Sequence, residues 1–159
     1  MIINRLHDVP LVINVKSLKN IDLSFFDFHR CFLNDMDISF SNLYNCDFRS
    51  AEINRTTINN SLLMKAKLIM LESEESEFVN TSFFNSYIFY STFKKINFEK
   101  ANFTGVIMNN NYFYNCNFCN AIMNCKGIET CNLNGSIYNK YTLWYNEINP
   151  EYLGAKLLK

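Results

Sequence analysis

A five-residue period runs through most of this chain and restricts its fold more than any other feature. Starting at Leu23, every fifth residue up to Leu133 is Leu, Ile, Phe or Met, and Ser73 is the one exception among the 23 positions. Neither the 3.6-residue period of an α-helix nor the two-residue period of a β-strand gives this pattern. It therefore indicates an internal repeat, and no insertion shifts its frame.

The other positions of each unit have their own preferences. The residue two before the large one is usually small, as at Ser41, Ala66 and Cys116, and the three remaining slots are mostly polar. Such a unit directs two side chains inward and three outward, and five residues are too few for a helix. The pattern predicts short extended pieces joined by tight turns and stacked so that the large residues form buried columns. With only 4 Gly and 2 Pro, ordinary turn residues do not account for these turns.

The units CNFCN, ANFTG, INFEK, CDFRS and SNLYN resemble those of the pentapeptide-repeat family, written loosely as Ala-Asp/Asn-Leu-x-x. The resemblance covers about residues 21–135. It implies an all-β fold, a right-handed quadrilateral parallel β-helix of about six coils in which four units form one square coil. Residue n then lies under residue n+20, with coils ~4.8 Å apart.

Both ends of such a stack need covers, because an open coil exposes unpaired backbone groups. We expect residues 1–20 to form an N-terminal cap, residues 21–135 the β-helix, and residues 136–159 a C-terminal cap with a short helix. Asn149 can cap that helix, Pro150 suits its first position, and Leu153 and Leu157 would share one face. Together with Trp144, these leucines are expected to close the last coil or to join a homodimer.

The charge balance and the apolar content of the chain limit the kinds of partner that we expect. Lys and Arg total 15, as do Asp and Glu, so the chain has neither a basic surface that attracts nucleic acid nor the strong acidity of a DNA mimic. No direct binding of nucleic acid is expected. The sequence contains no run of 18 apolar residues and no secretory signal pattern. We expect no membrane span, and a location that is cytoplasmic or reached by export without a classical signal peptide.

Six cysteines raise the question of a metal site. Cys116, Cys119, Cys125 and Cys131 form C-x2-C-x5-C-x5-C, which matches no usual zinc module. The five-residue frame puts Cys116 and Cys131 in small inward slots on different faces, and Cys119 and Cys125 in outward slots. Four sulfurs that point in different directions cannot form one tetrahedron, so we expect no metal and no cofactor.

Catalytic signals are equally weak. His7 and His29 are the only histidines, and nothing in the frame pairs either of them with a nucleophile. The sequence also lacks a glycine-rich phosphate loop. We expect a protein that is not an enzyme.

Large apolar residues in outward slots predict a patch on the surface. Tyr44, Met64 and Phe84 are twenty residues apart, and two further stacked pairs lie on the adjacent face. A contiguous exposed patch usually marks an interface, although stacked pairs that only stiffen the coil, at ~0.2–1 kcal/mol each, would give the same pattern. The candidate partner interface consists of Tyr44, Met64, Ile69, Met70, Phe84, Phe89 and Tyr90.

Two functions remain open at this point. The first is a scaffold for protein–protein interaction, such as a bacterial effector or an adaptor, with a protein partner whose identity the sequence does not reveal. The second is implied by the resemblance, since some family members inhibit or protect type II topoisomerases such as DNA gyrase by imitating DNA. The balanced charge of this chain departs from that second pattern.

The acidic run LESEESEFVN, residues 71–80, fits the frame without a loop. Its glutamates occupy outward slots, and the column Asp35, Arg55, Glu75, Lys95 alternates in sign, which predicts a partly neutralised face. Ser73 stands between Ile53 and Phe93 in a column of large residues. Against leucine it loses burial worth about 2–3 kcal/mol, so Ser73→Leu is predicted to raise the melting temperature.

Overall fold

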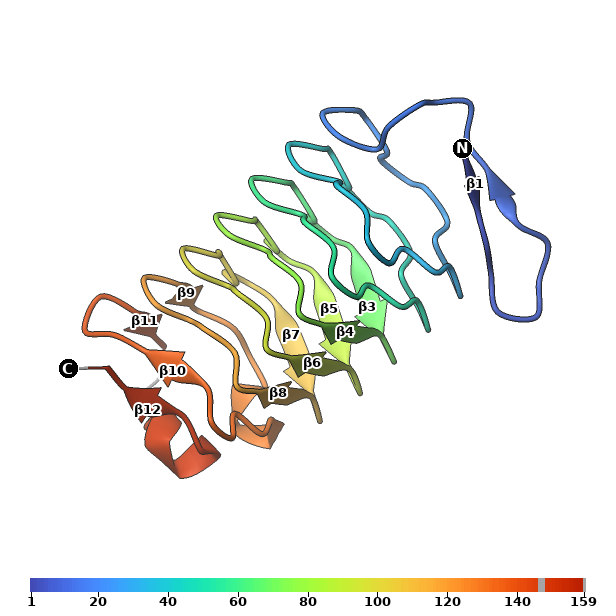
Figure 1. Ribbon diagram of the computed structural model, residues 1–159. Coiled ribbons are helices and arrows are strands. Elements are labelled where there is room, and N and C mark those ends of the chain that lie inside the picture. The colour runs from blue at the N-terminus through green and yellow to red at the C-terminus, as the bar shows by residue number, and fades with distance from the viewer. Residues whose placement is uncertain (146–147, 159) are drawn as a thin grey trace.

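The chain forms a square solenoid that carries a β-hairpin at its N-terminal end and two short 3-10 helices toward its C-terminal end (Figure 1). We describe it from a computed structural model, which covers residues 1–145 and 148–158. The two termini lie at opposite ends of the stack. The strands and 3-10 helices are β1 (Ile2–Ile3), β2 (Leu11–Val12), β3 (Lys67–Ile69), β4 (Glu72–Glu74), β5 (Tyr87–Phe89), β6 (Thr92–Lys94), β7 (Ile107–Asn109), β8 (Tyr112–Tyr114), β9 (Ile122–Met123), η1 (Ile128–Thr130), β10 (Ile137–Tyr138), β11 (Leu143–Trp144), η2 (Pro150–Leu153) and β12 (Lys156–Leu157).

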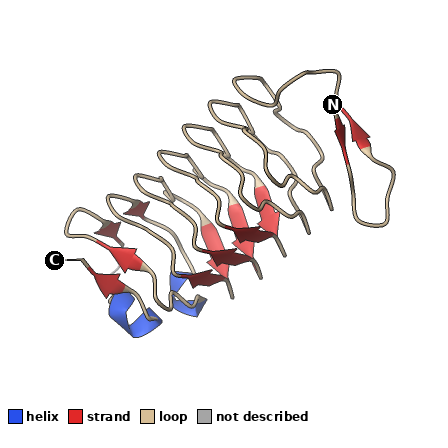
Figure 2. Cartoon of the chain, in the orientation of Figure 1, coloured by secondary structure: helices blue, strands red, loops and turns tan. Residues whose placement is uncertain are grey.

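Successive coils pair in parallel with an offset of twenty residues, as the frame predicts. Strands β3, β5 and β7 form one three-stranded sheet and β4, β6 and β8 another, and both are short and lie on adjacent faces (Figure 2). Leu68 pairs with Ile88, which in turn pairs with Met108. Isolated bridges from Asp22↔Asn42 to Asn117↔Ile137 extend the same ladder to the other faces. The right-handed parallel β-helix is confirmed.

The large slots build the core as continuous columns. From Leu23 to Leu133, every residue of this series is buried, Ser73 included. Phenylalanines twenty residues apart stack nearly parallel, with ring centroids 4.8 Å apart for Phe83 and Phe103 and 4.9 Å for Phe93 and Phe113. The coil spacing therefore matches a stacking distance that aromatic pairs favour.

Left-handed residues turn the chain at its corners. Every fifth residue from Asn20 to Asn120 has φ between 49° and 72°, and Gly105 is the only glycine among them. An L-residue in this region costs roughly 1–2 kcal/mol, but the corner N–H groups donate to carbonyls of the next coil, for example Met70 N to Phe89 O at 2.9 Å. The exceptions are Asn110 and Asn120, whose N–H groups donate to the side-chain oxygens of Thr130 and Asn139. The stacked ladder thus holds turns that would otherwise need glycine, which explains why the chain has so few.

Hydroxyls in the small slot determine how tightly each turn closes. Ser61 Oγ accepts a hydrogen bond from Ser41 N at 3.1 Å and donates one to Ile38 O at 2.9 Å, so it sits inside the turn of the preceding coil. The same pair of hydrogen bonds, one accepted and one donated, is made by the hydroxyls of Ser41, Thr56, Ser76, Ser91 and Ser136. Where Ala or Val stands one coil later, the turn closes directly, as in Cys46 N→Leu43 O, which lies one coil before Ala66. The small slot therefore selects hydroxyls for hydrogen bonding as well as for size.

Ser86 is the exception to this rule. The turn one coil earlier closes directly through Ala66 N→Leu63 O at 3.1 Å. Ser86 Oγ is buried and has no hydrogen-bond partner among the described residues. An unpaired buried hydroxyl is destabilising, so this slot is a local defect of the core.

The frame is not as regular as the sequence suggests near residues 124–130. Ile107 pairs with Lys126, an offset of nineteen, and η1 restores the twenty-residue offset at Tyr112↔Asn132. Gly127 permits this shortcut, because a Cβ there would lie 2.0 Å from Met108 O. The regular part of the solenoid has about four turns instead of the expected six, and its twenty-residue offset is broken at Ile107↔Lys126.

The C-terminal cap also differs from the expectation. Asn149 Oδ1 accepts a hydrogen bond from Glu151 N, and Pro150 begins the helix, as predicted. The helix is a single 3-10 turn, however, and ends at Gly154, whose φ of 97° is left-handed. Leu157 therefore lies in β12, which pairs in parallel with β10, and it shares no helical face with Leu153.

At the other end, β1 and β2 pair as an antiparallel hairpin that places Ile3 and Ile13 in the core. Arg5 joins the hairpin to the first coil by donating to Cys31 Sγ and Asp27 O. None of the helices among the described residues combines the length and apolar character that a bilayer span requires. The domain boundaries at residues 20 and 135 stay a prediction.

Candidate functional site

The predicted patch residues lie on two adjoining faces of the solenoid, and their exposure varies. Met70 and Tyr90, at one corner, are 56% and 57% exposed, and Phe84 is 37% exposed. Tyr44, Met64, Ile69 and Phe89 are half-buried. The structure brings Ile69 and Phe89 together as register partners. The patch therefore consists of half-buried columns with a more exposed corner.

Three apolar residues that sequence reasoning missed enlarge this surface. Tyr87 and Ile107 are register partners, each 41% exposed, and Leu62 is also exposed. Their twenty-residue spacing was a usable signal for Tyr87 and Ile107, because they occupy the outward slot before the large residue. We define the apolar face as Tyr44, Leu62, Met64, Ile69, Met70, Phe84, Tyr87, Phe89, Tyr90 and Ile107.

A groove runs along the corner between the two faces. It has a volume of about 350 Å³. Asn45, Asn85 and Gly105 line it from the corner column, while Lys67, Tyr87 and Ile107 line it from successive coils of the neighbouring face. Lys65, also in the corner column, completes the lining. The groove is cationic toward one end and apolar toward the other.

Gly105 shapes the apolar end of this groove. It is the only residue without a side chain in the left-handed corner series that runs from Asn20 to Asn120. A Cβ built on Gly105 would lie 2.1 Å from Asn85 Oδ1. The Asn85 side chain therefore occupies space that a larger residue at position 105 would need.

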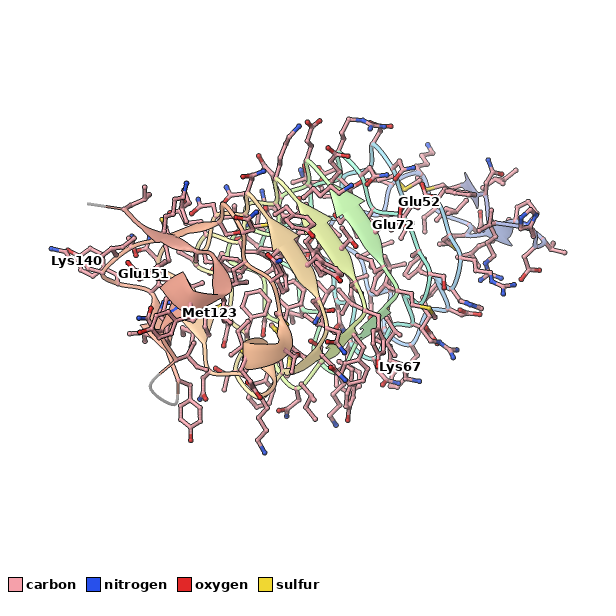
Figure 3. The ribbon with its side chains drawn as sticks, turned by 90° about the horizontal axis from the view of Figure 1, so that it is seen from below. Glu52, Lys67, Glu72, Met123, Lys140 and Glu151 are labelled. Atoms are coloured by element: carbon pink, nitrogen blue, oxygen red, sulfur yellow. The ribbon has the colours of Figure 1, made fainter. Side chains whose placement is uncertain are left out.

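The acidic run lies away from this groove, on the next face and its far corner. Figure 3 shows Glu52 and Glu72 close together and Lys67 apart from them. The predicted neutralised column is confirmed: Arg55 Nε lies 2.6 Å from Asp35 Oδ1, and Lys95 Nζ lies 2.7 Å from Glu75 Oε1. These pairs lower the pKa values of Asp35 and Glu75, by hydrogen bonding first and by charge second.

Ser73 lines a small depression on the face that carries the acidic run. The depression has a volume of about 160 Å³ and includes Glu72, Glu74 and Lys94 in its lining. Ser73 Oγ donates to Ile53 O, which also accepts from Ser76 Oγ at 2.8 Å. The hydroxyl is thus satisfied, and its bond duplicates one that Ser76 already makes.

All six cysteines are free and buried. The expectation that Cys125 points outward is wrong, because the shortened coil turns it inward into the core. Cys119 lies outside the core cluster, and neighbouring residues cover it. Burial raises the pKa of Cys46, Cys116 and Cys125 to about 12. Within the described part of the chain, no three His, Cys, Asp or Glu side chains gather where they could hold a metal ion.

The residues predicted for the C-terminal contact are split between core and surface. Trp144 and Leu153 pack against the core, and the Trp144 ring meets that of Tyr138 edge to face at 5.5 Å. Leu157 is exposed on β12, next to the exposed Leu158. Only Leu157 of the three predicted residues is available to a partner.

Comparisons with known proteins agree with this architecture. The family model "Pentapeptide repeats" matches in eight copies over residues 17–68 and 90–124. No curated protein matches the sequence significantly.

Several solved structures are similar to the chain. A pentapeptide repeat protein from the thylakoid lumen of Arabidopsis thaliana is 18% identical, with 86% of this chain and 76% of that chain covered and a TM-score of 0.42. Rfr23 from the cyanobacterium Cyanothece 51142 is 19% identical, with 80% and 87% covered and a TM-score of 0.40. QnrB1, a plasmid-mediated fluoroquinolone resistance protein, is 13% identical in a trypsin-treated form, with 87% of each chain covered and a TM-score of 0.43. Because the family model matches more than half of the sequence, the chain belongs to the pentapeptide-repeat family.

Proposed function

We propose that this protein is a non-enzymatic scaffold that binds a protein partner through its apolar face. The observation that carries the proposal is that ten apolar side chains lie in adjoining slots of two faces, several of them more than a third exposed. Contiguous apolar surface of this kind is unusual on a protein that has no partner.

The composition of the face favours an interface over simple stiffening of the coils. Columns that only stiffen the solenoid gain most when they cover each other, as Ile69 and Phe89 do. Met70 and Tyr90 instead remain more than half exposed. Aromatic residues and Met are enriched in the buried centre of protein interfaces, and charged residues are depleted there.

The test is a capture experiment with a double variant at the exposed corner, Met70→Asp/Tyr90→Asp. A matched control, Tyr112→Asp/Tyr141→Asp, places the same charge on exposed residues outside the apolar face. We expect the first variant to lose its captured partner and the control to retain it, with unchanged circular dichroism in both. Retention of every partner by the first variant would contradict the proposal.

The alternative of a DNA-mimicking topoisomerase inhibitor has less support. Arg55, Lys94 and Lys95 lie among the acidic side chains that would have to imitate DNA, and two close ion pairs neutralise part of that surface. A gyrase supercoiling assay with the purified protein distinguishes the two functions, because the scaffold proposal expects no inhibition and no protection.

A C-terminal homodimer remains a proposal as well. The exposed Leu157 and Leu158 on and beside β12 support it, since an edge strand with apolar side chains can pair with another chain. Light scattering across a concentration series should show a dimer that Leu157→Asp converts to a monomer. A monomer at all concentrations would contradict this part of the proposal.

A further inference from the structure

The corner groove between the two faces has a chemistry of its own. Lys65 and Lys67 lie toward one end, and Tyr87 and Ile107 line it over the next two coils. Within residues 1–145 and 148–158, neither lysine makes an ion pair. This part of the groove therefore carries positive charge that no close ion pair of the described chain neutralises, and the one carboxylate whose pKa the Lys67 charge helps to lower is that of Asp47.

The surroundings of the two lysines leave their charge available. Asp47 is the register partner of Lys67 on the preceding coil, but it is engaged by Arg49, whose Nε donates to both of its oxygens at 2.9 and 2.8 Å. Lys65 Nζ lies 5.4 Å from the centroid of the Tyr44 ring. This contact positions the ammonium without neutralising it. A carboxylate brought by a partner would be attracted to both lysines.

The dimensions of the groove suit an extended peptide. Lys67, Tyr87 and Ile107 occupy three successive coils, which span about 9.6 Å at strand spacing. An extended chain advances ~3.3 Å per residue, and its side chains i and i+2 point the same way about 6.6 Å apart. A carboxylate beside the lysines would then place the second side chain against Tyr87 and Ile107.

We propose that this groove binds an extended segment of a partner protein that carries an acidic side chain two residues from an aliphatic or aromatic one. The proposal rests on the scaffold function proposed above and assigns the partner's recognition chemistry. The acidic side chain lies between Lys65 and Lys67, and the apolar one covers Tyr87 and Ile107.

Other classes of ligand fit the groove less well. Nucleic acid binding gains its affinity from many phosphate contacts, whereas this groove offers two lysines in a chain of zero net charge. Five of the seven lining residues are uncharged. A peptide with one carboxylate and one apolar side chain is complementary to both the cationic end and the apolar end of the groove.

The test is an NMR titration of the ¹⁵N-labelled protein with two short peptides, Ala-Glu-Ala-Leu-Ala and Ala-Leu-Ala-Glu-Ala, which cover both chain directions. We expect saturable shifts of the amide signals of Lys65, Lys67, Asn85 and Gly105 with at least one of them. Peptides with Gln or Lys in place of Glu should bind at least about tenfold more weakly, since they lack the charge attraction.

Three variants test whether the peptide binds in the groove. Lys65→Glu/Lys67→Glu should abolish the shifts, while Lys16→Glu/Lys140→Glu, which changes the net charge equally on exposed residues elsewhere, should preserve them. Gly105→Asn should also weaken binding, because a Cβ at position 105 would lie 2.1 Å from Asn85 Oδ1 and would displace the Asn85 side chain that lines the groove. Asparagine already occupies this left-handed slot at Asn85 and Asn110. Unchanged dispersion of the remaining amide signals confirms that each variant is folded.

Several outcomes would overturn the proposal. They are the absence of saturable shifts with either acidic peptide at millimolar concentration, equal binding of the Gln or Lys peptides, shifts that map outside the groove, and stronger binding of a four-nucleotide oligo(dT). The capture experiment separates this failure from failure of the scaffold function. If Lys65→Glu/Lys67→Glu keeps the partner that Met70→Asp/Tyr90→Asp loses, the apolar face binds and the groove does not.

Discussion

Replacing two buried serines by alanine should have opposite effects, although both occupy the small slot and are fully buried. Ser61 Oγ accepts from Ser41 N and donates to Ile38 O, so it satisfies two buried backbone groups. Ser86 Oγ satisfies none among the residues that the structure describes. Comparing the two variants separates the effect of the hydroxyl's hydrogen bonds from the effect of side-chain size, because each variant removes the same oxygen atom.

The expected magnitudes follow from these partners. Ser61→Ala leaves a buried donor and a buried acceptor unpaired, each worth about 1–3 kcal/mol in the worst case. The turn can recover part of this by closing directly, as Cys46 N→Leu43 O does at 3.2 Å. We therefore expect a net loss of about 1–2 kcal/mol for Ser61→Ala and a change between zero and a gain of about 1 kcal/mol for Ser86→Ala.

The assay is chemical and thermal unfolding followed by circular dichroism. A loss of 1 kcal/mol lowers the melting temperature of a chain of this size by about 2–4 °C, so the two variants should differ by several degrees. Equal losses in the two variants, or a larger loss in Ser86→Ala, would refute the idea that hydroxyls in the small slot act by entering the turn of the preceding coil.

Four further outcomes are expected. Ser73→Leu should raise the melting temperature, because it adds burial between Ile53 and Phe93 and loses a hydrogen bond that Ser76 duplicates; a clear decrease would show that the site has no room for leucine. Phe40→Gly should stabilise the protein by about 0.5–1 kcal/mol in urea unfolding, because glycine adopts its φ of 61° without strain. The pKa of Asp37 is lowered to about 2 by Lys19 and Ser39, so this group stabilises the fold above pH ~4 and loses its contribution as the pH falls toward 2; melting curves of Asp37→Asn should lack that part of the pH dependence. The six buried thiols should react with a disulfide reagent at pH 8 far more slowly in the native state than in urea.

The sequence by itself determined the repeat, its register and the columns of the core. Each of these depends only on the slot that a residue occupies and on a coil length of twenty residues, so the burial of Phe83 and the pairing of Glu75 with Lys95 could be predicted before any coordinates. The Asn149 cap was predictable for the same reason, since capping is a local interaction.

Other features depend on contacts between coils and needed the tertiary structure. Whether a turn closes directly or through a hydroxyl is decided by a residue twenty positions later, and the shortened coil before η1 turns Cys125 inward against the frame. The candidate site also has one part that the sequence predicted and one part that needed the structure. Stacked pairs located most of the apolar face, but the groove exists because Lys65, Tyr87 and Gly105 come from three successive coils and two faces. Only the stacking of those coils brings a cationic end, an apolar end and a missing side chain into one surface.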